Sequence, residues 1–194
     1  MSSVPALHMT CAPEAPPLYL HGFEGSVQGT KGRHLHEMFG STGPEMPTYR
    51  HRTDEFGETP WCFEECFAIA RDFVVSQPCS VLVGSSFGGA VTLALLQRGV
   101  WVGPVVLLAP AGALYGFAPY IPRNCHAIVI HDPADDVVPF EGSERLTKEN
   151  DQRVELWSSD GGHRLHSVVE SGLLERAVRA QVERAGALRD SYDL

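Results

Sequence analysis

The sequence predicts an α/β protein with a mainly parallel, doubly wound sheet of about six to seven strands and helices on both faces. Short, continuously apolar runs alternate along the chain with longer segments whose apolar residues repeat at helical spacing. The apolar runs lack polar alternation, as expected for strands that are covered on both faces. Functional sites in such sheets form at the carboxyl ends of the strands.

The predicted elements follow in chain order. Apolar runs bounded by glycine, proline or polar residues predict strands over 18–23 (breaking at Gly22), 80–85, 105–111 and 127–132. A short strand is also expected at 46–50, and 153–159 is expected to be a strand at the sheet edge because its apolar residues partly alternate with polar ones. Helices are predicted over part of 26–39, over 61–77, which has one apolar stripe, and over 88–99, which is rich in small and aliphatic residues. A polar helix is expected over 140–151, and a final helix from Leu165 to about 187 has apolar residues at helical spacing. Pro78 and Gly99 end two of them.

Length, composition and charge narrow the class of protein. A chain of 194 residues with 43% hydrophobic content fits one domain with a substantial core. We expect a flexible leader over 1–17 and a single domain over 18–194. The net charge of −9, from 15 Lys+Arg and 24 Asp+Glu, disfavours nucleic acid and anionic lipid as partners. No apolar run approaches the roughly 18 residues that span a bilayer. Composition leaves the oligomeric state open.

The cysteines indicate a reducing compartment. There are five of them, Cys11, Cys62, Cys66, Cys79 and Cys125, which is an odd number without the density of a disulfide framework. We therefore expect reduced, mostly buried thiols in a cytoplasmic protein.

Residues 81–90, VLVGSSFGGA, place a serine between glycines where a predicted strand meets a predicted helix. Gly84, Ser86 and Gly88 match the G-x-S-x-G nucleophile elbow, although a simple strand-to-helix turn gives the same pattern. Small neighbours are needed because the nucleophile has a strained backbone. The N–H of Phe87, at the helix start, would face a developing oxyanion. Ser85 is the alternative nucleophile, but it lacks the glycine spacing and is expected to face the interior.

A serine nucleophile needs a base to take its proton. His163, in the glycine turn DGGHRL after the last predicted strand, is the first candidate. A base on that loop can reach a nucleophile on another loop at the same sheet edge. His166 is the competitor, and it falls within the predicted final helix, where a surface position is expected.

The base in turn needs a carboxylate that fixes its tautomer and stabilises the imidazolium. Residues 131–139, HDPADDVVP, supply three directly after a predicted strand. Asp135, in mid-turn, is the first choice, Asp136 the second and Asp132 the third. The same acids also suit a turn or a helix cap, and His131 is expected to stabilise the turn rather than to act in catalysis.

These segments resemble the α/β-hydrolase superfamily over about residues 18–187. The matching segments are LYLHGF (18–23), GSSFGG (84–89), HDPADDVVP and DGGHRL (160–165), and the chain order Ser…Asp…His is that of the superfamily. The arrangement is most similar to small bacterial esterases of the YqiA type. One residue departs from the usual acid-loop pattern, because Asp132 stands where a glycine is usual.

The resemblance implies a role for each matching residue. Ser86 would be the nucleophile, His163 the base and Asp135 the acid, while the backbone N–H groups of Phe23 and Phe87 would form the oxyanion hole.

The resemblance also bears on the substrate. Only residues 111–124 separate two predicted strands at the point where many relatives insert a cap, and this segment is too short for a lid domain. Its large side chains, Tyr120 among them, either wall a shallow acyl pocket or pack as an ordinary loop. The residues expected to contact substrate are His21, Gly22, Leu114, Tyr115 and Phe117.

The sequence therefore predicts a cofactor-free serine esterase that acts on carboxylic esters, or thioesters, with small or exposed acyl groups. We expect neither a metal nor a nucleotide, since His34 and His36 fall on different helix faces and no phosphate-binding glycine motif is present. A peptidase or amidase with the same triad is an alternative. A binding protein that has the fold but lacks activity is another.

Overall fold

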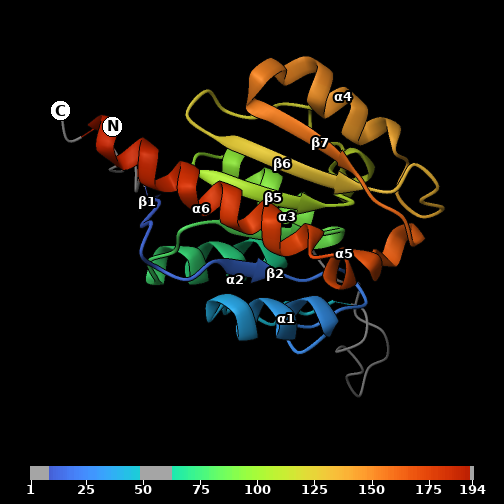
Figure 1. Ribbon diagram of the computed structural model, residues 1–194, viewed down its shortest axis with the longest axis horizontal. Coiled ribbons are helices and arrows are strands. Elements are labelled where there is room, and N and C mark those ends of the chain that lie inside the picture. Colours follow the sequence, from blue (N-terminus) through green and yellow to red (C-terminus); the bar gives the residue numbers. More distant parts are fainter. Residues whose placement is uncertain (1–8, 49–62, 193–194) are drawn as a thin grey trace.

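The computed structural model describes residues 9–48 and 63–192, and its centre is a parallel sheet of five strands (Figure 1). The spatial order is β2-β3-β5-β6-β7. The strands are β2 (Leu18–Leu20), β3 (Leu82–Ser85), β5 (Pro104–Leu108), β6 (His126–His131) and β7 (Val154–Ser158). All neighbouring pairs are parallel, so the predicted α/β class and parallel sheet are confirmed.

The predicted strand number is too high for this sheet, which has five strands among the described residues rather than six or seven. The expected strand at 46–50 is absent over 46–48, and 49–50 lie outside the described residues. The backbone N–H of Met46 donates to Nε2 of His21 at 2.9 Å instead of to a neighbouring strand. The strand prediction is therefore wrong over 46–48, where the backbone hydrogen-bonds to a side chain.

Helices cover both faces of the sheet. They are α1 (Thr30–Phe39), α2 (Phe63–Ser76), α3 (Phe87–Gln97), α4 (Glu141–Asn150), α5 (Ser167–Glu170) and α6 (Leu173–Tyr192). Alternate residues of each strand point to opposite faces. On β5, Val105 and Leu107 pack with the α2–α3 layer, while Val106 and Leu108 pack with the layer that contains α1, α5 and α6. Figure 1 shows α6 crossing one face of the sheet.

The final helical segment is two helices rather than the one that was predicted. Leu165 has a positive φ of 48°, so regular helix begins only at Ser167. Gly172, with φ of 69°, ends the first helix, and α6 starts at Leu173. A left-handed residue cannot continue an α-helix, and glycine adopts that conformation without a Cβ penalty.

The described part of the predicted leader is paired to the rest of the chain. β1 (Met9–Thr10) pairs in parallel with β4 (Trp101–Val102), and the N–H of Ala12 donates to the carbonyl of Cys79 at 2.8 Å. The domain boundary at residue 18 stays a prediction.

The link between β5 and β6 is short. It consists of residues 109–125 and holds one 3₁₀ segment, η2 (Ala111–Tyr115), with no helical cap. Within 9–48 and 63–192, no helix has the length and apolarity needed to cross a membrane, and no three His, Cys, Asp or Glu side chains are grouped to bind a metal ion.

Candidate active site

The three residues predicted for nucleophile, acid and base lie at one edge of the sheet. Ser86 follows β3, Asp135 follows β6 and His163 follows β7. The register pairs Ser85 with Leu108 and Leu108 with Ile130, so the carboxyl ends of these strands are level. In Figure 1 the arrowheads of the parallel strands point toward this edge.

Ser86 has a strained backbone, with φ of 52° and ψ of −111°. A non-glycine residue rarely adopts a positive φ, which costs on the order of 1–3 kcal/mol. Neighbouring segments hold it there, because its N–H donates to the carbonyl of Leu108 at 2.8 Å and its carbonyl accepts from Ala111 at 3.1 Å. The turn thus presents the Ser86 side chain at the start of α3.

The two flanking glycines leave no room for side chains. A Cβ on Gly88 would lie 2.0 Å from the carbonyl oxygen of Leu20, and one on Gly84 would lie 2.6 Å from the carbonyl oxygen of Gly88. Both contacts are with backbone, which cannot swing aside. Glycine is therefore required here by the close packing of β2, β3 and α3.

A chain of hydrogen bonds connects the three side chains. The hydroxyl oxygen of Ser86 lies 2.9 Å from Nε2 of His163, and Nδ1 of His163 lies 2.8 Å from Oδ2 of Asp135. A carboxylate only accepts, so Nδ1–H donates to Asp135 and Nε2 accepts from the Ser86 hydroxyl. The competing base, His166, is exposed at the start of α5.

Asp135 is the carboxylate that reaches the histidine, and its side chain is fully buried. Its Oδ1 accepts from the N–H groups of Val137 and Val138 at 2.8 and 2.9 Å. Burial raises the pKa of Asp135, but hydrogen bonds from Val138, His163 and Val137 outweigh it and hold that pKa below its ordinary value. The group is ionised at neutral pH. Asp136, the second choice, is exposed.

Asp132, the residue that departs from the usual pattern, joins the acid loop to the histidine loop. Its Oδ2 accepts from the N–H of Gly162 at 2.6 Å, and its Oδ1 accepts from the N–H of Ala134 at 2.8 Å. Gly162 immediately precedes His163, so this carboxylate fixes the backbone that carries the imidazole. From the sequence, Asp132 was only a third candidate for the acid.

We expect Asp132→Ala to lower the free energy of unfolding by about 1–3 kcal/mol, because the Gly162 N–H loses its acceptor. Turnover falls by about tenfold as the His163 loop loosens. Chemical denaturation and steady-state kinetics measure the two effects. The matched control is Asp136→Ala on the same loop, which is expected to change stability by about 0.5 kcal/mol or less. Equal effects of the two variants would contradict this role.

The predicted oxyanion-hole residues flank Ser86. Phe87 is the first residue of α3, where the helix dipole is positive. Phe23 lies in the turn after β2, and its ring meets that of Phe87 edge-on with centroids 6.0 Å apart. A Cβ on Gly22 would lie 3.4 Å from the Cβ of Ser86, so this turn adjoins the elbow. The placement suits an oxyanion hole, and the role itself stays a prediction.

His21 is buried, and the expected contact of its ring with substrate stays a prediction. Its exposed fraction is 0%. Nδ1 lies 2.8 Å from the carbonyl oxygen of Gly22, and Nε2 accepts from the N–H of Met46 at 2.9 Å. The ring bridges the turn after β2 and the segment near Met46, so it supports the turn that carries Phe23.

Aromatic rings cluster next to the first turn of α3. Tyr115 lies 5.5 Å from both Phe63 and Phe87, and Phe117 lies 5.3 Å from Phe63, measured between ring centroids. Two of the three loop residues predicted to contact substrate are thus part of an aromatic wall, and Leu114 is 56% exposed. Phe63 was not singled out from the sequence, where it lies within the predicted helix over 61–77.

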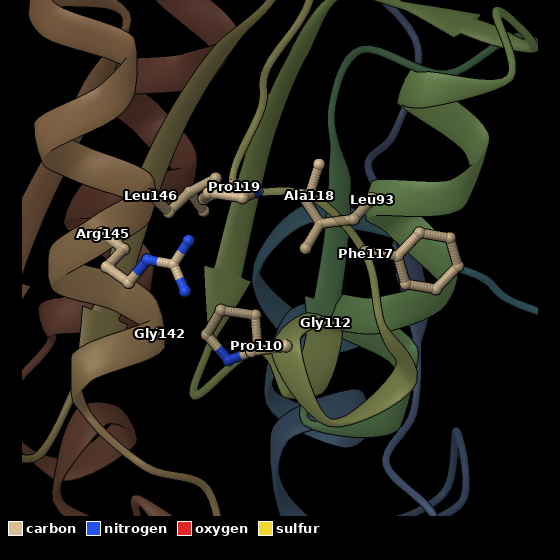
Figure 2. A pocket seen from close by; sticks show the side chains of 10 residues that line it. Leu93, Pro110, Gly112, Phe117, Ala118, Pro119, Gly142, Arg145 and Leu146 are labelled. Carbon is tan, nitrogen blue, oxygen red and sulfur yellow. The ribbon is translucent and has the colours of Figure 1, made fainter.

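A small pocket of about 40 Å³ lies between η2 and α4 (Figure 2). Leu93, Pro110, Phe117 and Arg145 are among its lining residues. Figure 2 shows the Arg145 guanidinium reaching from α4 into the pocket. Pro110 packs against Gly89 in the first turn of α3, where a Cβ would lie 2.9 Å from the proline Cα. The pocket therefore adjoins the elbow.

No protein-family model matches the sequence, and no curated protein is significantly similar to it. Solved structures do match. An α/β serine hydrolase homologue from Coxiella burnetii is 18% identical with a TM-score of 0.66, over 88% of this chain and 86% of that one. Est1E from Butyrivibrio proteoclasticus, solved with ferulic acid, is 15% identical with a TM-score of 0.65, over 89% of this chain and 91% of that one.

A serine hydrolase without a lid from Xanthomonas campestris is 16% identical with a TM-score of 0.63, over 88% of this chain and 86% of that one. The narrower resemblance to YqiA-type esterases stays a prediction. The sheet order, the helix layers and the similar solved structures all indicate the same fold: the chain has the α/β-hydrolase fold, and the described residues, 9–48 and 63–192, form no cap domain.

Proposed function

We propose that the protein is a serine hydrolase that cleaves carboxylic esters, or thioesters, with small or exposed acyl groups. The observation that carries the proposal is the hydrogen-bond chain from the Ser86 hydroxyl through His163 to Asp135, with contacts of 2.9 and 2.8 Å. A base that is hydrogen-bonded to a hydroxyl and oriented by a buried carboxylate is the arrangement that activates serine. The strained elbow and the neighbouring hydrolases of the same fold support it.

In the first half of the reaction, Ser86 attacks the ester carbonyl carbon while Nε2 of His163 takes the hydroxyl proton. Asp135 stabilises the imidazolium, and the N–H groups of Phe23 and Phe87 hold the negative oxygen. The tetrahedral intermediate then loses the alcohol or thiol, which leaves with the proton from His163. The acyl group remains bonded to Ser86.

In the second half, His163 takes a proton from water, and the resulting hydroxide adds to the acyl carbon. The second intermediate expels Ser86, which recovers its proton from His163. The carboxylic acid departs and the starting state is restored. No step requires a group beyond these side chains, the backbone amides and water.

We also place this reaction in the cytoplasm. Cys11, Cys79 and Cys125 are free thiols, and burial raises the pKa of each. Structural disulfides form and persist in oxidising compartments, so free thiols support a reducing one.

The test is a panel of p-nitrophenyl esters from acetate to octanoate, with p-nitroanilides of the same acyl groups. We expect hydrolysis of the short esters, with kcat/KM falling as the chain lengthens, and anilide cleavage slower by about a hundredfold. Comparable rates for anilides would favour a peptidase or amidase. If neither series is cleaved and a thioester panel is also inert, the esterase proposal is wrong.

A further inference from the structure

Oδ2 of Asp135 contacts two imidazoles, not one. Nδ1 of His163 lies 2.8 Å from it, and Nε2 of His131 lies 3.0 Å from it. The other carboxylate oxygen is occupied by the N–H groups of Val137 and Val138. The proposed mechanism uses His163 and assigns no role to His131.

His131 is held in one tautomer by a second contact. Its Nδ1 lies 2.7 Å from the hydroxyl oxygen of Ser143, in the first turn of α4. Because the Asp135 carboxylate only accepts, His131 donates from Nε2–H, and its Nδ1 must accept from the Ser143 hydroxyl. His131 has an exposed fraction of 0% and Ser143 of 1%, so water does not compete for either bond.

His131 serves as a neutral donor. Burial lowers its pKa, and the hydrogen bond to Asp135 offsets this only in part. The titratable groups that face the ring are Asp135 on the acid loop and His163 on the histidine loop. On the α4 side the ring meets the Ser143 hydroxyl and the edge of Phe140, with ring centroids 5.3 Å apart. Because His131 is neutral, its hydrogen bond stabilises the negative charge of Asp135 without placing a positive charge beside it.

We propose that His131, with its tautomer fixed by Ser143, is a positioning residue that holds Oδ2 of Asp135 toward His163 and moderates its charge. The inference rests on the proposed function, because it concerns the same hydrogen-bond chain. The chain of hydrogen bonds then connects five side chains, those of Ser86, His163, Asp135, His131 and Ser143. A donor on Oδ2 restrains rotation of the carboxylate, and it draws negative charge away from the side that meets His163.

Two consequences follow when the donor is lost. Freed rotation of the carboxylate misplaces the His163 ring, which lowers the rate of Ser86 attack. The full charge of Oδ2 then acts on the imidazolium alone, so the base holds its proton to a higher pH. A residue that merely supported the fold would lower stability without moving the pH midpoint of the reaction.

The experiment measures the second-order rate of labelling by a fluorophosphonate across pH, which needs no knowledge of the substrate. We expect His131→Leu to label about ten- to a hundredfold more slowly, with its pH midpoint higher by about half a unit or more. His131→Gln can place an amide N–H where Nε2 lies and is expected to restore most of the rate and the midpoint. Steady-state ester kinetics should show the loss in kcat rather than in KM.

The matched control is His126→Leu. His126 is a second buried histidine on β6, and its Nδ1 contacts Gln181 at 3.2 Å, away from Asp135. Its loss is expected to lower stability and leave the pH midpoint unchanged. Ser143→Ala removes a single oxygen, so it can replace His131→Leu in the test if that variant does not fold. We expect Ser143→Ala to be labelled about threefold more slowly, with the pH midpoint shifted in the same direction.

The outcomes separate the two proposals. If the unaltered protein does not label at all, the serine hydrolase proposal fails and this inference fails with it. If the unaltered protein labels while His131→Leu, or Ser143→Ala in its place, keeps both rate and midpoint, only the role of His131 is wrong. A midpoint shift of equal size in His126→Leu also overturns it.

Discussion

Ser86→Ala is expected to abolish labelling by a fluorophosphonate and to lower ester turnover by about a thousandfold or more. The hydroxyl oxygen of Ser86 lies 2.9 Å from Nε2 of His163, and alanine removes the atom that forms the acyl bond. Residual turnover would come from water acting in a site that still binds the ester. Mass spectrometry of the intact protein measures the adduct, and a chromogenic ester measures turnover.

The matched control for this prediction is Ser85→Ala, one residue earlier in the chain. Ser85 is buried at the end of β3 and hydrogen-bonds to Tyr19, so its hydroxyl is committed elsewhere. We expect Ser85→Ala to label at the normal stoichiometry. An adduct that persists in Ser86→Ala and disappears in Ser85→Ala would show that the wrong serine had been assigned.

The sheet was predictable because burial on both faces leaves a clear pattern in the sequence. Val105 and Val106 point to opposite faces, yet both are fully buried, so the run is apolar throughout. The strand expected at 46–50 is not formed over 46–48, because a short sequence segment does not determine which hydrogen-bond partner its backbone will have. Here the partner of Met46 is the ring of His21.

The positions of Ser86, Asp135 and His163 were predictable because each follows a strand. Parallel strands place their carboxyl ends at one edge, so three loops distant in sequence meet there. Which aspartate contacts His163 depends on turn geometry, which the letters HDPADDVVP leave open. In the structure, hydrogen bonds from the N–H groups of Val137 and Val138 hold Oδ1 of Asp135, and its Oδ2 contacts His163.

Contacts between loops were not predictable. Asp132 accepts from Gly162, thirty residues away in the chain, and His131 meets Ser143 across the start of α4. Neither the periodicity of apolar residues nor the spacing of motifs indicates which of these residues will be hydrogen-bonded to each other. One weak signal existed, because an aspartate at a position where glycine is usual needs a reason, and the tie to the histidine loop supplies one.

Gly88→Ala is expected to lower the free energy of unfolding by about 3 kcal/mol or more and to reduce turnover sharply. The added Cβ would lie 2.0 Å from the carbonyl oxygen of Leu20 and 2.6 Å from that of His21. Relief requires α3 to move away from β2, and α3 begins one residue after Ser86. The shift would also separate Phe87 from the turn that carries Phe23, so stability and turnover fall together.

Gly186→Ala is the matched control, since it makes the same chemical change within α6, where the new Cβ would meet no heavy atom within 4 Å apart from its chain neighbours and the backbone of its own helix. Alanine favours a helix over glycine by about 1 kcal/mol, so this variant should gain stability and keep full turnover. Thermal unfolding followed by circular dichroism gives the two stabilities. If Gly88→Ala were as stable as the unaltered protein and as active, the elbow would not be packed against β2 as described, and the case for a rigidly held Ser86 would fail.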